Sequence, residues 1–198
     1  MFLKEEIFFY VILFIVLGVS LKMFLDSDAY NLTCVVSTVD GDKYCVRETA
    51  NIEKSADLLA SVAGRCKRLV VFMKKKYSDR EDVERLYKGF SSTKITETLP
   101  TSTLTAYSEN KGQKIAFCLN KKKNGTELID MNTLTFVAIH ELAHIMTLSV
   151  GHKQEFWENF KFLLEGATEL GIYVPEDYKK KPAEYCSMMI NDNPYYDV

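Results

Sequence analysis

The sequence has only three histidines among its 198 residues, and it has no large excess of charge of either sign. Its 25 Lys and Arg residues and 27 Asp and Glu residues give a formal net charge of −2. Proteins that bind nucleic acid through its phosphates present a strongly basic surface, so no nucleic-acid partner is expected. Apolar residues make up 47% of the chain, which is enough for a packed core and excludes disorder throughout.

The five cysteines include no Cys-x-x-Cys pair, so they do not indicate a structural zinc knuckle. Because their number is odd, at least one of them is unpaired. Cys34 and Cys45 flank an Asp-Gly turn dipeptide and could be linked in an oxidising compartment. Two glycosylation sequons, at Asn31 and Asn124, would matter only if this part of the chain is lumenal.

The N-terminus carries the one long apolar run. The segment Ile7–Leu21 reads IFFYVILFIVLGVSL, and Met23–Leu25 extends it to about the length that spans a bilayer core. A core helix of this length would normally show a polar face, and this run has none. We therefore predict that residues 1–25 form a single-pass membrane anchor.

A cleaved signal peptide, cut after the small residues Gly18 and Ser20, is the alternative to an anchor. The anchor is favoured because apolar residues continue past this point and because two glutamates lie near the start of the chain. The orientation of the anchor in the membrane stays open, since Lys4 and Lys22 place one positive charge on each side of the apolar run.

No low-complexity linker divides residues 26–198, which are predicted to form a single domain. Residue periodicity and turn signals predict its elements. They are a hairpin of Thr33–Val39 and Lys43–Arg47, a long helix over Ile52–Tyr77, a shorter helix opened by a Ser78/Glu81 capping box and ending near Gly89, a loop or irregular strand over Ser91–Thr103, a hairpin of Leu104–Tyr107 and Lys114–Leu119, and helices over Met131–Gly151 and Lys153–Leu170.

The helix predicted over Met131–Gly151 is apolar nearly all round and should be buried, with Asn132 or Thr133 as N-cap. Its ionisable residues are His140, Glu141 and His144. Burying three such groups is costly unless something pairs with them, and a metal ion is the natural partner.

Residues four apart share one face of a helix, which allows His140 and His144 to bind a single Zn²⁺. Glu141 beside them can act as the catalytic general base, taking a proton from water and returning it to the leaving amine. A catalytic zinc usually has three protein ligands, and His152 is the preferred third. Glu155 and Glu165 on the following helix compete for that role.

At these residues the sequence resembles the zincin metallopeptidases, and among them the small SprT-like and WLM (minigluzincin) families. The shared pattern is HExxH at residues 140–144, followed by His152 and a Phe156-Trp157 pair. The resemblance covers Leu104 to Gly171 and is closest to membrane-anchored versions from large DNA viruses and algae. Seven residues separate the second and third histidines here, whereas the soluble families usually have five.

The resemblance implies an α+β zincin-like fold, in which a small mixed sheet packs on helices and HExxH lies on a buried active-site helix. It also implies an edge strand, by analogy Lys114–Leu119, that binds extended substrate by β-addition. An oxyanion stabiliser is expected, and four tyrosines could supply its phenol. These are Tyr107, Tyr173, Tyr178 and Tyr185. We interpret Phe156 and Trp157 as core packing.

Together these features predict a membrane-tethered zinc metalloendopeptidase acting on protein or peptide substrates. The DNA–protein crosslink repair of soluble relatives fits poorly with an anchored chain that has no basic domain. A different class is the alternative: a membrane-anchored structural or interaction protein, for example of a virion, that keeps the fold without turnover. If the apolar run is cut off, the product would instead be a secreted peptidase.

Overall fold

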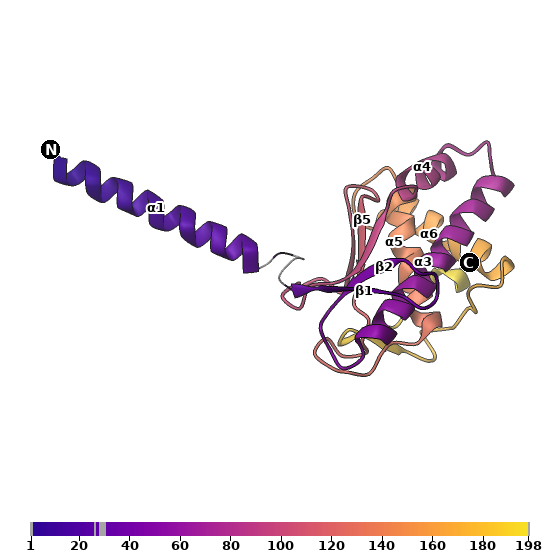
Figure 1. Ribbon diagram of the computed structural model, residues 1–198. Coiled ribbons are helices and arrows are strands. Elements are labelled where there is room, and N and C mark those ends of the chain that lie inside the picture. Colours follow the sequence, from indigo (N-terminus) through magenta and orange to yellow (C-terminus); the bar gives the residue numbers. More distant parts are fainter. Residues whose placement is uncertain (1, 26, 28–30, 198) are drawn as a thin grey trace.

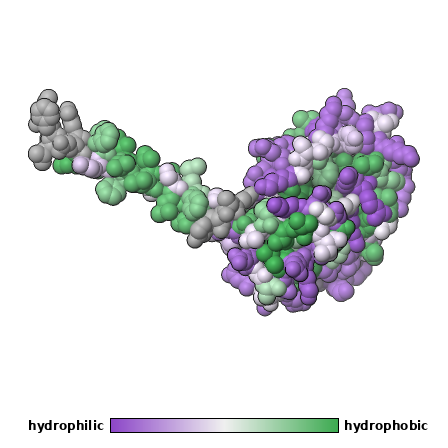
Figure 2. Space-filling view, viewed as in Figure 1, coloured by the Kyte–Doolittle hydropathy of each residue, from purple (hydrophilic) through white to green (hydrophobic). Residues whose placement is uncertain are grey.

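The computed structural model describes residues 2–25, 27 and 31–197, and its first element is a helix that stands apart from the rest (Figure 1). This helix, α1, spans Phe2–Leu25. Its segment Ile7–Leu25 has a mean hydropathy of 2.5 and is not buried against the protein. Figure 2 shows its apolar surface beside a mostly hydrophilic domain. By length and composition it is the one helix in the described part of the chain that could cross a membrane, a test that a signal sequence also passes.

A five-stranded mixed sheet forms one layer of the domain, in the order β1-β2-β3-β5-β4. Its strands are β1 (Thr33–Val36), β2 (Lys43–Val46), β3 (Lys94–Glu97), β4 (Ala106–Glu109) and β5 (Lys114–Phe117). β1 pairs with β2 and β4 with β5 in antiparallel fashion, whereas β3 lies parallel to both β2 and β5. Helices α3 and α5 pack on this sheet, which confirms the predicted α+β class.

Both predicted hairpins form, and the segment predicted as loop or irregular strand contains a regular strand, β3. Pro100 and the abundance of Ser and Thr suggested irregular backbone over Ser91–Thr103. Instead, Ile95 and Thr96 pair with β5, and Thr96 also opposes β2. Both residues are β-branched and suit a strand. Pairing with strands distant in sequence, on both sides at Thr96, outweighs the irregular backbone that Pro100 and the neighbouring Ser and Thr residues favour locally.

The prediction that Lys114–Leu119 is the edge strand is wrong. β5 lies inside the sheet, between β3 and β4, and both of its sides are paired. β3 pairs with the side of β5 that the prediction left unpaired. The edge strand that packs against α5 is therefore β4, Ala106–Glu109.

Four helices pack with the sheet or with one another: α3 (Ile52–Lys76), α4 (Glu81–Phe90), α5 (Met131–Met146) and α6 (Gln154–Glu169). The predicted apolar stripe of α3 is its buried face, which includes Leu59, Cys66 and Met73. The capping box predicted for α4 does not form, because the N-cap is Arg80 and the Ser78 hydroxyl donates to Asp79 instead.

Helix α5 differs from its prediction at both ends. Its N-cap is Asp130, whose carboxylate accepts the backbone N–H of Thr133 at 2.9 Å. It ends at Met146, five residues before Gly151. The reason is tertiary: the Lys111 ammonium donates to the carbonyls of His144 and Thr147, and so satisfies acceptors that a longer helix would have used itself.

The C-terminal region forms a small hairpin that no pattern predicted. Strands β6 (Ala183–Tyr185) and β7 (Met188–Ile190) pair around Cys186 and Ser187, and the short 3₁₀ helix η1 (Pro194–Tyr196) follows. A disulfide joins Cys186 to Cys118, at the end of β5. A second disulfide, Cys34–Cys45, links directly opposed residues of β1 and β2, as the sequence allowed.

Candidate metal centre

The imidazoles of His140, His144 and His152 converge on one point. Nε2 of His140 lies 3.2 Å from Nε2 of His144 and 3.1 Å from Nε2 of His152. One ring nitrogen from each residue lies within 4.8 Å of the other two. Three nitrogens bound to one zinc ion at 2.0 to 2.1 Å in a tetrahedron would lie ~3.3 Å apart, so the cluster fits that ion.

Two neighbouring segments supply these rings. His140 and His144 lie one turn apart on α5, while His152 lies in the turn before α6. Gly151 has a φ of 81°, a left-handed conformation in which glycine carries no steric penalty. The turn between Met146 and His152 reverses the chain, which explains how the longer spacing still brings a third histidine to the cluster.

Neither rival ligand belongs to the histidine cluster. The Glu155 carboxylate accepts the backbone N–H groups of Leu148 at 2.9 Å and Ser149 at 3.2 Å, so it holds the turn that carries His152. Glu165 is exposed on α6 and does not belong to the cluster. Of the three candidates, the structure brings only His152 to the two helix histidines.

Aromatic rings support the cluster from α6. The ring of Phe156 lies 4.4 to 4.8 Å, centroid to centroid, from all three imidazoles and is fully buried. Trp157 is 43% exposed and lines the pocket beside the cluster, and its indole N–H donates to the His152 carbonyl at 3.1 Å. Core packing is therefore the right interpretation for Phe156 and the wrong one for Trp157. Helical spacing did not distinguish these adjacent positions.

The two helix histidines are held in their neutral form. Burial lowers the pKa of His140 to about 3, helped by the nearby His144 and His152. Burial also lowers the pKa of His144 to about 4, with smaller contributions from His152 and Lys111. A neutral imidazole is the form that binds a metal ion, so both rings are ready to act as ligands near pH 7.

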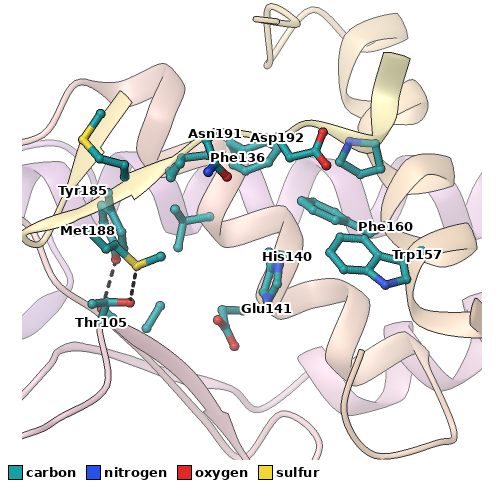
Figure 3. A pocket seen from close by; sticks show the side chains of 15 residues that line it. Thr105, Phe136, His140, Glu141, Trp157, Phe160, Tyr185, Met188, Asn191 and Asp192 are labelled. Carbon is teal, nitrogen blue, oxygen red and sulfur yellow. Dashed lines mark hydrogen bonds between the residues drawn. The ribbon is translucent and has the colours of Figure 1, made fainter. Parts of the chain in front are cut away.

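Glu141 lies next to the cluster, on the floor of a pocket. Its side chain is only 4% exposed, and within the described part of the chain its Oε2 atom has no hydrogen-bond partner. Burial raises its pKa to about 8. Figure 3 shows its carboxylate beside His140 at the open side of α5. An unpartnered buried carboxyl oxygen is expensive, and a bound water or ion beside it would satisfy it.

The pocket has a volume of about 260 Å³ and mostly apolar walls (Figure 3). Helices α5 and α6 form one side, and the segment just before and within β4 forms another. The C-terminal hairpin and the residues that follow it close the third. The lining residues are Thr105, Ala106, Phe136, Val137, His140, Glu141, Trp157, Phe160, Tyr185, Met188–Asp192 and Pro194.

Of the four tyrosines considered for an oxyanion site, Tyr185 lines this pocket. Its hydroxyl donates to the Thr105 carbonyl at 3.1 Å, and burial raises its pKa, with a further contribution from Glu141. Tyr173 and Tyr178 pack against Phe136 in the core. Because Tyr185 is only 1% exposed and already bonded, it forms the wall of the pocket.

Sequence reasoning missed the hairpin that carries Met188 and Asp192 to the pocket. Met188 accepts a hydrogen bond from the Thr105 hydroxyl through its sulfur, at 3.3 Å, which ties β7 to the start of the edge strand. The available signal was the pair Cys118 and Cys186, whose disulfide joins these parts of the chain. Spacing alone could not have selected that pair among five cysteines.

Comparisons with known proteins found a matching family model and several relatives. Residues 80–191 match the model of the WLM domain. The uncharacterized protein R325 of Acanthamoeba polyphaga mimivirus is 29% identical over 163 residues, covering 80% of this chain and 82% of its own length. The uncharacterized protein 136R of Invertebrate iridescent virus 6 is 39% identical over 82 residues, covering 41% of this chain and 44% of its own length.

Among solved structures, the crystal structure of Wss1 from Saccharomyces cerevisiae aligns with 64% of this chain and 86% of its own, at 20% identity and a TM-score of 0.49. The WLM match spans more than half of the sequence and includes every residue of the histidine cluster. The chain therefore belongs to the WLM-domain family, a family of zincin-like metallopeptidases.

Proposed function

We propose that this protein is a zinc-dependent endopeptidase tethered to a membrane by α1. One observation carries the proposal: three converging imidazoles, two of them held neutral by burial, lie beside an unpartnered buried carboxyl at the floor of an open pocket. His140, His144 and His152 would hold the zinc ion. When bound, zinc supplies Lewis acidity that acidifies water and polarises the scissile carbonyl.

The role of Glu141 follows from its burial and position. Its free Oε2 atom can accept the proton that the attacking water loses, and the protonated carboxyl can then deliver that proton to the leaving amine. Burial raises the proton affinity of the carboxylate, which favours the first of these steps. A nearby zinc ion would favour the ionised form and so keep the base available.

The edge strand β4 would bind the substrate. Ala106 on this strand lines the pocket, and no described strand pairs with the side of β4 that faces away from β5. An extended peptide can add to such an edge through backbone hydrogen bonds. This binding mode accepts many sequences, because it contacts groups that every residue carries.

Side-chain preference would come from the apolar pocket. Phe136, Phe160 and Met188 give it a wall suited to a large apolar side chain adjacent to the scissile bond. We propose that unfolded or flexible protein segments near the membrane are the substrates, with residues 1–25 as anchor and residues 26–198 as the catalytic domain. A chain tethered by α1 reaches only those segments that come close to the same surface.

The test uses the full chain in detergent, assayed for zinc content and for cleavage of an unfolded protein. We expect about one zinc ion per chain in the parent and in Glu141→Gln, with cleavage only in the parent. His152→Ala should lose zinc, whereas the matched variant Glu165→Ala should retain it. A parent without zinc contradicts the proposal. Bound zinc without Glu141-dependent cleavage would favour the structural role considered from the sequence.

A further inference from the structure

Four of the five cysteines are joined in pairs by the fold. Cys34 and Cys45 oppose each other across β1 and β2. Cys118 and Cys186 are 68 residues apart in sequence, yet their Cα atoms lie 6.0 Å apart, a normal separation for a disulfide. The fifth cysteine, Cys66, is buried in the core, and burial raises the pKa of its thiol to about 12. It is therefore protected from exchange with the other four.

The Cys118–Cys186 bridge stabilises a turn that has an unfavourable backbone. Cys186 and Ser187 have φ values of 50° and 65°, the left-handed region that two-residue hairpins require and that Gly or Asn usually fills. The N–H of Cys186 donates to the Asn120 carbonyl at 3.1 Å and that of Ser187 to the Lys121 carbonyl at 2.8 Å. The disulfide joins the hairpin turn to the same segment after β5 that accepts these two hydrogen bonds, so it holds the turn in place together with them.

Structural disulfides persist in oxidising compartments and are rare where thiols are kept reduced. We propose that the domain following α1 resides on the oxidising, non-cytosolic side of the membrane and that it carries an N-linked glycan on Asn124. Each disulfide forms when two thiols give two protons and two electrons to a thiol oxidant of that compartment. The inference concerns location and modification, so it stands independently of peptidase activity.

Asn124 has the position of a glycosylation acceptor. It is exposed in a turn of the loop Lys121–Glu127, where the N–H of Gly125 donates to the Lys122 carbonyl at 2.8 Å. The base of this loop is closed by a 3.0 Å hydrogen bond from the Lys121 N–H to the Glu127 carbonyl. A compact loop with an exposed sequon at its turn projects the amide into solvent and can carry a bulky glycan.

The other sequon is placed less favourably. Asn31 is half-buried, and its amide nitrogen donates to the carbonyls of Leu25 at 2.6 Å and Ser27 at 3.0 Å. In the transfer reaction the amide nitrogen bonds to C1 of a glycan carried on a lipid pyrophosphate, loses one proton, and releases the lipid pyrophosphate. Asn124 is exposed to solvent, whereas the amide nitrogen of Asn31 is engaged in hydrogen bonds to the carbonyls of Leu25 and Ser27.

The N-terminal helix is consistent with this location. A mostly apolar helical segment of 19 residues near the N-terminus directs a chain to a translocating membrane, whether it is retained or cut off afterwards. When the segment that follows is translocated, it reaches the oxidising side with both sequons. The disulfides and the exposed sequon are independent observations that indicate the same compartment.

The experiment expresses the full chain in eukaryotic cells and compares it with Asn124→Gln, Thr126→Ala and Asn31→Gln. In gel electrophoresis, we expect enzymatic removal of N-glycans to make the parent and Asn31→Gln migrate faster, by a shift that corresponds to the loss of one glycan. The mobility of Asn124→Gln and of Thr126→Ala should not change. A shift that is lost only in Asn31→Gln, or a parent without any glycan, overturns the Asn124 assignment.

Thiol counting tests the compartment separately. Alkylation of the unfolded, unreduced chain should label only Cys66, and prior reduction should raise the number of labelled cysteines to five. Peptide mapping should recover the Cys34–Cys45 and Cys118–Cys186 pairs. Five free thiols in the freshly isolated chain would overturn the proposed location, even if zinc is bound and peptides are cleaved.

Discussion

Nε2 of His152 lies 3.1 Å from Nε2 of His140, although a helix end and a five-residue turn separate the two residues along the chain. This closeness depends on the turn, and the turn depends on Glu155, which accepts two of its backbone N–H groups. The position of the third ligand is therefore set by a residue that is not itself a ligand.

Replacing Glu155 by Ala should weaken zinc binding by roughly 10-fold to 100-fold, because outer residues that orient a ligand have effects of this size. The fold should persist, since Glu155 lies in the first turn of α6 and is not on its buried face. Competition with a chelator measures the affinity. The control is Glu158→Ala, an exposed glutamate one turn further that contacts Gln154. If Glu155→Ala and Glu158→Ala bound zinc with equal affinity, the turn would keep His152 in position without the help of Glu155.

Replacing Met188 by Trp should narrow the pocket and change substrate preference. Cleavage of peptides with a large apolar residue beside the scissile bond should fall about tenfold or more, since a misfit side chain in such a pocket costs ~1 to 3 kcal/mol. Peptides with alanine there should be affected less. The measurement is the ratio of kcat/KM for peptides with the large apolar residue to kcat/KM for peptides with alanine at that position. Val174→Trp, at an exposed site outside the pocket, should leave the ratio unchanged.

Removing the long-range disulfide by the double change Cys118→Ser and Cys186→Ser should loosen the C-terminal hairpin. The bridge closes a 68-residue loop, so its loss should cost up to ~4 kcal/mol of stability and should also raise KM, because the hairpin lines the pocket. Urea unfolding and kinetics measure the two effects.

The matched control for that experiment is the double change Cys34→Ser and Cys45→Ser. It opens a loop of 11 residues on the far hairpin, so it should cost up to ~3 kcal/mol and leave KM unchanged. If both double variants had the same KM as the parent, the hairpin would keep its position without the bridge.

Replacing Arg47 by Met should destabilise the domain by about 3 to 5 kcal/mol, because it leaves the buried Glu97 carboxyl without its cation. The Arg47 guanidinium is almost fully buried, lies 3.4 Å from Glu97 and donates to the Thr98 carbonyl at 2.8 Å. Urea unfolding measures the loss. The double variant with Glu97→Gln should recover part of it, and no recovery would argue against the ion pair as the cause.

The sequence alone determined the features that depend on neighbours along the chain. His140 and His144 share a helix face because four residues make about one turn, and the cost of burying them beside Glu141 pointed to a metal. The hairpin around Asp40-Gly41 and the apolar helix α1 follow equally from local pattern. The helix predicted over Ile52–Tyr77 likewise forms almost as expected.

Only the tertiary structure decided what depends on contacts distant in sequence. Lys111 satisfies carbonyls at the end of α5 and so helps to end that helix at Met146, and the turn beyond it brings His152 to the cluster. Parallel pairing with β3 moves β5 inside the sheet and leaves β4 as the edge. The Cys118–Cys186 bridge brings Met188 to the pocket. Such contacts gain their energy from residues far apart in the chain, which no local pattern records.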